Sequence, residues 1–267
     1  MHPRLLSTLV LIEPVILDEN HGGPNDALGS TRRRDVWDSP AKAEMQLRKA
    51  FSTWDQRALE KYLRHGLRAV PTALYDPSKN KKISPDSVTL TTSKHQEAWD
   101  YAQVSFDPQN ATLDRLLLPD WDPVIELPNF SSRPECLITM RNLLQLRPSV
   151  LWVFGGKSPL SLPHFQDKKM KATGVGVGGN GGVAEGKVEK KVLAKSGHLL
   201  VFEQPDECAD AIADWIERWF GRWLDEETVI RKHGSKKSDD GMLRMSKAWV
   251  DAVKLPTNAP RPKATRL

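Results

Sequence analysis

Two short runs of the sequence, residues 8–12 and 150–154, are continuously apolar, and this feature constrains the fold most. Strands that helices cover on both faces carry such uninterrupted runs, whereas half-exposed strands alternate apolar and polar residues. A third run, residues 188–193, includes Glu189 and two lysines, which is typical of a strand near a sheet edge. The three runs predict three parallel strands of one sheet.

Helical patterns follow the second and third of these runs. The better one begins after Pro205, with Asp206 as the expected N-cap. Its apolar residues recur at steps of three and four, on one face of a helix: Ile212, Ile216, Trp219 and Trp223. Strands that alternate with helices in this order predict an α/β fold with an open sheet.

The segment between the first two runs shows no strand pattern. Ser39-Pro40 begins a helix, and shorter helices are expected near residues 93–106 and 133–146. The first of these helices carries an apolar face: Leu47, Phe51, Trp54, Ala58 and Tyr62. Prolines are frequent in the connections between these helices, so the segment is expected to be a mostly helical insertion.

These patterns divide the chain into three parts. Residues 1–19 and 147–223 are expected to form the α/β core, and residues 20–146 the helical insertion. Residues 224–267 are polar and basic and are expected to form a C-terminal tail.

Charge and cysteine content exclude several function classes. The net charge is +5, but the basic residues are scattered and are not interleaved with aromatic residues, so no nucleic-acid partner is expected. No apolar run approaches the ~20 residues of a membrane span. Cys136 and Cys208 are far apart and lack metal-ligand spacing, so neither a metal nor a disulfide is expected, and a reducing, intracellular location follows. No cofactor is expected.

The residues that follow the strands indicate chemistry. Glu13 follows the first strand and His198 follows the third, and loops at the carboxyl ends of parallel strands meet at one edge of a sheet. A carboxylate beside a histidine fixes the imidazole tautomer, and the imidazole can then move a proton. The alternatives are that Glu13 caps the strand end or pairs with an arginine of the insertion, and that His198 makes an ordinary structural hydrogen bond.

Three segments together resemble a known family. They are HPRLLSTLVLIEPVI (residues 2–16), PSVLWVFGGKSPLS (148–161) and VLAKSGHLLVFEQPDECADAIADWI (192–216). They are similar to the sixth, seventh and eighth strand regions of the α/β-hydrolase superfamily. The similarity is greatest to fungal-type members such as the peroxisomal lipase of yeast and the hydrolases of toxin-biosynthesis clusters. The Gly-His pair at 197–198, followed by Pro205 and an amphipathic helix, is the most specific motif.

The resemblance implies a partial α/β-hydrolase fold that consists of the last three parallel strands, with the helical insertion as the lid. It implies that His198 is the general base. Many members place the acid after the seventh strand, where this chain has Lys157-Ser158-Pro159. Some members place it after the sixth strand instead, and Glu13 holds that position. Glu13 is therefore the candidate acid.

The sequence does not contain a nucleophile motif. The family's elbow needs Gly-x-Ser-x-Gly or a close relative, and none occurs in the 267 residues. The chain is therefore expected to be a hydrolase truncated before the nucleophile and inactive alone. The alternative is a non-catalytic remnant or binding scaffold of the same fold.

Two glycine motifs resemble nucleotide sites. Gly155-Gly156-Lys157-Ser158 follows a strand, but the first glycine of a phosphate loop would fall on Leu151, inside the strand. Nucleotide binding at Lys157 is therefore a weaker hypothesis. The Gly-x-Gly-x-x-Gly at 174–179 precedes a strand instead of following one, so we interpret it as a flexible connection.

The resemblance also suggests a substrate and a location. The substrate is expected to be a small apolar acyl compound or ester, and Trp37, Trp54 and Trp99 of the insertion are candidates for lining its pocket, although core packing explains them equally well. The last residues, Thr265-Arg266-Leu267, resemble a peroxisomal import tripeptide. An import receptor is therefore a possible partner, and the cytoplasm is the alternative location.

Overall fold

The computed structural model describes residues 5–18, 27–101, 103–104, 131–132, 134–234, 241 and 243–253. The chain divides into two compact units, residues 1–216 and 217–267. No helix in the described ranges is both long enough and apolar enough to cross a membrane.

A three-stranded parallel sheet forms the centre of the first unit. Its strands are β1 (Thr8–Ile12), β7 (Ser149–Gly155) and β8 (Val188–Leu193), in the order β1-β7-β8. β7 is buried along its whole length, which explains its uninterrupted apolar run. In β8 the inner residues are partly or fully exposed and the ends are buried, as expected for a strand at the edge of the described sheet. The three predicted strands and their parallel pairing are confirmed.

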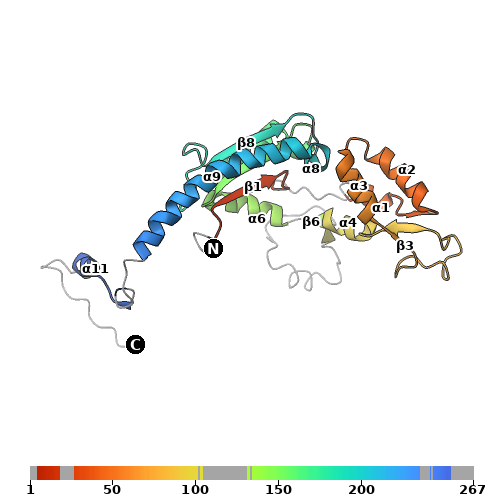
Figure 1. Ribbon diagram of the computed structural model, residues 1–267, viewed down its shortest axis with the longest axis horizontal. Coiled ribbons are helices and arrows are strands. Elements are labelled where there is room, and N and C mark those ends of the chain that lie inside the picture. Colours follow the sequence, from red (N-terminus) through yellow and green to blue (C-terminus); the bar gives the residue numbers. More distant parts are fainter. Residues whose placement is uncertain are drawn as a thin grey trace. The chain divides into compact units, whose positions relative to one another are not determined.

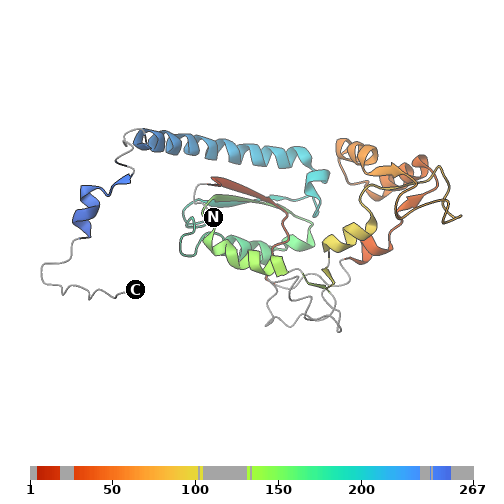
Figure 2. The same cartoon turned by 90° about the horizontal axis from the view of Figure 1, so that it is seen from below.

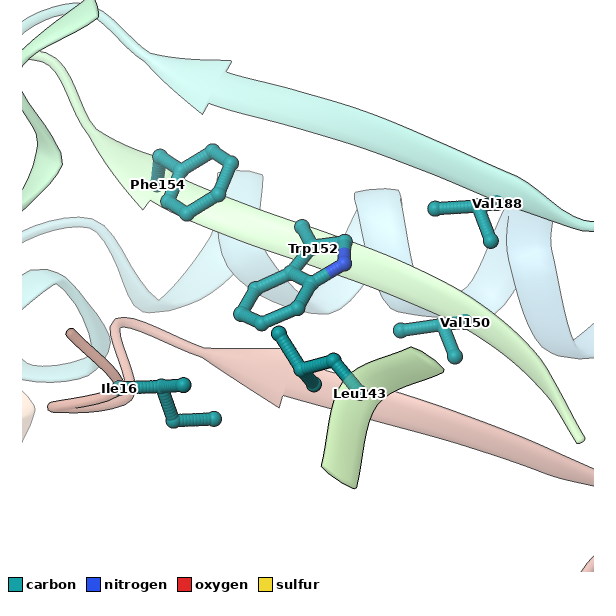
Figure 3. Packing of buried hydrophobic residues seen from close by; sticks show 6 residues of the cluster. All are labelled: Ile16, Leu143, Val150, Trp152, Phe154 and Val188. Carbon is teal, nitrogen blue, oxygen red and sulfur yellow. The ribbon is translucent and has the colours of Figure 1, made fainter. Parts of the chain in front are cut away.

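Helices cover both faces of this sheet (Figures 1 and 2). On one face, alternate β7 residues form the main core cluster, together with Ile16, Leu143 and Val188 (Figure 3). Residues of α6 (Pro134–Asn142) and α7 (Pro163–Ala172) pack against this cluster. The first part of α9 (Pro205–Gly234) covers the other face, where Trp215 is buried and its indole N–H donates to the Thr8 hydroxyl at 2.8 Å.

The segment between β1 and β7 is helical but also contains strands. Its helices are α1 (Leu28–Arg32), α2 (Pro40–Ala50), α3 (Gln56–His65) and α4 (Lys94–Tyr101). A small antiparallel sheet has the order β2-β4-β3, formed by β2 (Val36–Trp37), β3 (Leu67–Ala69) and β4 (Val88–Leu90). β5 (Gln103–Val104) pairs with β6 (Ser131–Ser132). The prediction that this segment contains no strand is therefore wrong.

One helix prediction also needs correction, and another is confirmed. The apolar face from Leu47 to Tyr62 belongs to two helices, because the chain turns between α2 and α3 and Asp55 caps the second helix. The helix expected near residues 133–146 is confirmed as α6 and the 3₁₀ turn η1 (Leu143–Gln145), and its Met140 and Leu143 pack against the central sheet.

The second unit contains the end of α9 and the short helix α11 (Lys247–Ala252). α9 continues to Gly234, well into residues 224–267, which were expected to form a polar tail. The Thr265-Arg266-Leu267 tripeptide lies outside the described residues.

Candidate active site

Glu13 lies at the carboxyl end of β1 in an unusual backbone conformation. Its N–H donates to the Val153 carbonyl at 2.9 Å, which is the last bond of the β1–β7 ladder. Its φ is 43°, and among the described residues it is the only non-glycine residue with a positive φ. Such a conformation raises the free energy of a residue other than glycine by about 1–2 kcal/mol, and such conformations are concentrated at functional sites. The turn directs a carboxylate, only 5% exposed, back over the end of the sheet.

Both oxygens of this carboxylate are hydrogen-bonded. Oε1 accepts from the backbone N–H of Gly155 at 2.6 Å and from the hydroxyl of Ser161. Oε2 lies 3.2 Å from Nδ1 of His198. Among the described residues no arginine pairs with Glu13, so the alternative of a pairing with the insertion is not what the structure shows.

These contacts keep the Glu13 carboxyl ionised. Burial by itself would raise its pKa, but hydrogen bonds from His198, Ser161, Ser158 and the Gly155 amide outweigh burial and leave the pKa below its usual value. A carboxylate that stays ionised when buried is the kind of group that can hold and stabilise a neighbouring imidazolium.

Close packing between the end of β7 and the loop after β8 sets the position of His198. A β-carbon on Gly155 would lie 2.1 Å from the Gly197 carbonyl oxygen, and one on Gly156 would lie 2.7 Å from the Ala194 α-carbon. The Lys157 N–H donates to the Ser196 carbonyl at 2.9 Å. Positions 155 and 156 therefore need glycine so that the loop that carries His198 can lie close to the end of β7. This requirement explains the two glycines without phosphate binding.

The loop is also fixed from its other end. The Gly197 N–H donates to Oε2 of Glu203, in α8 (Leu200–Glu203), at 2.5 Å, and the buried Ser196 hydroxyl donates to Gln204. His198 itself remains open, with a side chain that is 36% exposed. The loop is rigidly held while the imidazole keeps access to a reacting group.

The structure thus brings Glu13 and His198, 185 residues apart in the chain, into direct contact. It also adds two residues that the sequence analysis did not single out as partners. The Ser161 hydroxyl donates to Glu13, and Ser158 contributes to the lowered pKa of the Glu13 carboxyl. No sequence pattern marks these serines, because their role depends on the turn that Glu13 makes.

The glycine motif at 174–179 joins α7 to β8. Its amides bond to nearby backbone: the Gly174 N–H donates to Leu143 and the Gly176 N–H to Leu144, both at 2.8 Å. These hydrogen bonds fix the segment to η1 (Leu143–Gln145), whereas a flexible connection was expected. The strand that follows them, in place of a helix, does not fit a dinucleotide loop.

The three candidate pocket tryptophans have different surroundings. Trp37 is buried in the core of the insertion, where it donates to Gln46, so packing explains it. Trp99 is 67% exposed. Trp54 stacks on Phe202 of α8, with ring centroids 4.5 Å apart. Beside this pair lies a cavity of about 550 Å³ lined by α3 and α8, including Tyr62, Val201 and Phe202 but none of the three tryptophans.

The sequence is similar to fungal proteins of known families. It is 34% identical over 224 residues to the type I acyl-CoA thioesterase mpaH of Penicillium roqueforti, a match that covers 76% of this chain and 51% of the relative. It is 31% identical over 212 residues to the abhydrolase domain-containing protein AFT2-1 of Alternaria alternata, covering 78% of this chain and 73% of the relative. The chain thus spans about half the length of the thioesterase relatives.

The fold is similar to a solved structure. The peroxisomal alpha-beta-hydrolase Lpx1 of Saccharomyces cerevisiae superposes with a TM-score of 0.54 at 14% identity, covering 82% of this chain and 47% of that protein. No family model matches the sequence.

Proposed function

Because this chain belongs to the α/β-hydrolase superfamily, we propose that Glu13 and His198 are the acid and the general base of a catalytic triad. The observation that carries the proposal is the contact between the Glu13 carboxylate and Nδ1 of an otherwise accessible histidine at the end of the sheet. This is the geometry that a base and its orienting carboxylate require.

The contact assigns a role to each nitrogen of the imidazole. Glu13 accepts the Nδ1–H, so Nε2 is left as the base. Nε2 takes the proton of a nucleophilic hydroxyl as its oxygen attacks the acyl carbonyl, and returns it to the leaving group when the tetrahedral intermediate collapses. Glu13 stays ionised throughout and stabilises the imidazolium. Water then repeats the sequence on the acyl-enzyme and releases the carboxylic acid.

The proposed triad needs a nucleophile and an oxyanion hole, and the 267 residues contain no nucleophile elbow. We propose that a segment equivalent to the unmatched part of the thioesterase relatives supplies them. The chain alone is then expected to be inactive. The substrate we propose is an acyl thioester or ester with an apolar acyl group, and the names of the thioesterase relatives support the thioester.

The cavity beside Phe202 supports an apolar acyl group. Its volume falls in the range of small-molecule pockets, and its lining includes the side chains of Val201, Phe202 and Pro205. Val201 and Phe202 belong to α8, so a ligand bound there would contact the helix whose Glu203 holds the Gly197-His198 loop.

The test is to join the unmatched part of the Penicillium roqueforti thioesterase ahead of residue 1 and to assay the fusion with acyl-CoA. The fusion is expected to release free CoA thiol, and the chain alone is expected to release none above its His198→Ala variant. A fusion that unfolds cooperatively in urea but does not hydrolyse any acyl-CoA or short acyl ester contradicts the proposal. Hydrolysis by the chain alone would reveal a nucleophile within it.

We also propose that the chain enters peroxisomes, through recognition of Thr265-Arg266-Leu267 by the import receptor. The form of the tripeptide supports this, and the structural relative is peroxisomal. A fluorescent protein that carries the last twelve or so residues is expected to collect in peroxisomes, and the same fluorescent protein without Leu267 is expected to stay in the cytosol. A cytosolic distribution of both fluorescent proteins would contradict the proposal.

A further inference from the structure

Lys169, in α7, is a buried cation that the proposed chemistry does not use. The residue is only 1% exposed. Its ammonium lies over two buried aromatic rings of β7, 5.9 Å from the centroid of Trp152 and 5.5 Å from that of Phe154. Among the described residues it forms no ion pair with a carboxylate. The charge is held by ring faces and by backbone carbonyls.

Lys169 contacts two backbone carbonyls, one next to Glu13 and the other next to a residue that donates a hydrogen bond to Glu13. The ammonium donates to the carbonyl oxygens of Pro14 and Leu160, each at 3.4 Å. Pro14 directly follows Glu13, and Leu160 directly precedes Ser161, which donates to Glu13. One side chain therefore joins the turn that carries the acid to the turn that carries its hydrogen-bond donor.

Burying a lysine at this position is energetically unfavourable if its only role is to fill space. Burial favours the neutral amine and lowers the pKa of Lys169 to about 8, while the negative charge of Glu13, and that of Cys136 when ionised, act in the opposite direction. An apolar side chain of similar length would fill the same volume without the free-energy cost of removing a charge from water.

We propose that Lys169 is a positioning residue for Glu13. Its ammonium holds the Glu13-Pro14 turn and the Leu160-Ser161 turn at a fixed separation, and its positive charge favours the ionised carboxylate. The proposal deepens the assignment of Glu13 as the acid and rests on it, but it concerns the ionisation of Glu13 and not hydrolysis.

The test measures the ionisation of Glu13 in the full chain by the ¹³C resonance of its carboxyl carbon during a pH titration. Lys169→Met, which keeps the apolar stem and removes the charge and its donors, is expected to make Glu13 about tenfold weaker as an acid. Loss of the charge and weakening of the Ser161 hydrogen bond both act in this direction. Lys169→Arg, which keeps a positive charge and donors, is expected to restore part of the difference.

Lys168→Met is the matched control, since Lys168 is the neighbouring residue and its exposed ammonium pairs with Asp18 instead. It is expected to leave the Glu13 titration unchanged. If Lys169→Met also leaves it unchanged, Lys169 only fills the core and the proposal is overturned.

A second measurement needs no variant and so does not depend on whether Lys169→Met folds. In the unmodified chain, the Glu13 carboxyl carbon is expected to show a small second inflection near pH 8, coincident with that of the ¹⁵Nζ resonance of Lys169. Absence of this inflection, while the Lys169 nitrogen titrates, overturns the proposal. Neither experiment depends on catalysis. If the fusion is inactive but Lys169 still affects the titration of Glu13, the result rejects the hydrolase function and leaves the proposal for Lys169 in place.

Discussion

Replacement of His198 by alanine is expected to abolish hydrolysis by the fusion protein, lowering kcat/KM for acyl-CoA by about 10⁴-fold or more. The physical reason is that the nucleophilic hydroxyl keeps its proton when no base lies beside it. Only the oxyanion hole and substrate binding would then accelerate the reaction. Because His198 is more than one-third exposed and lies outside the core clusters of the part of the chain that the structure describes, the variant is expected to fold normally.

His164→Ala is the control for this prediction. His164 is an exposed histidine at the start of α7 and makes no contact with Glu13. Its replacement is expected to leave kcat/KM within about twofold of the parent. Equal activity of the His198 variant and the parent fusion would show that another residue is the base.

Replacement of Glu13 by glutamine is expected to lower kcat/KM of the fusion by about 10²–10⁴-fold. Glutamine has nearly the same shape, and its amide oxygen can still accept from Gly155 and Ser161. Its NH₂ group would then face Nδ1 of His198, so the imidazole would accept there and carry its proton on Nε2. The base would be present in the wrong tautomer. Glu185→Gln, which changes an exposed carboxylate, is the control and is expected to be fully active.

The same substitution also predicts a pH dependence of stability. Because the pKa of Glu13 is lowered in the folded chain, ionised Glu13 stabilises the fold fully above its unfolded pKa, and this contribution is lost as the pH falls through the folded value. The difference in unfolding free energy between the parent chain and Glu13→Gln is therefore expected to shrink below about pH 4.5. Urea titrations at several pH values measure it, and a difference that grows in acid would contradict the assignment.

The central sheet and the Glu13–His198 pair were predictable because each depends on a strong local pattern. Continuous apolar runs identify strands that are buried on both faces, and a general property of parallel sheets places their trailing loops together. The contact between two residues so far apart in the chain follows from that topology and needs no knowledge of the side-chain packing.

The hydrogen-bond partners of the carboxylate were not predictable in this way. Ser161 donates to Glu13 at a point where the Glu13 backbone turns through a positive φ, and no sequence pattern indicates that conformation for a glutamate. Lys169 lies in a basic stretch that resembles an exposed helix face, and only the packing of α7 against the sheet shows that it is buried.

The strands of the insertion were missed for a different reason. β2, β3 and β4 are two or three residues long, so none is long enough to show an alternating pattern. The break between α2 and α3 was hidden because Phe51 and Trp54, which stack on each other in the turn, continue the helical spacing by chance. Tertiary packing decided both features.

The central claim, that Glu13 acts through His198, is tested most directly by combining the two substitutions in the fusion protein. If the carboxylate serves only to orient and stabilise the imidazole, it has no role once the imidazole is gone, so Glu13→Gln with His198→Ala is expected to be as slow as His198→Ala alone. If the two losses in kcat/KM multiply instead, the residues act independently, and the account of this site as an acid–base pair is contradicted.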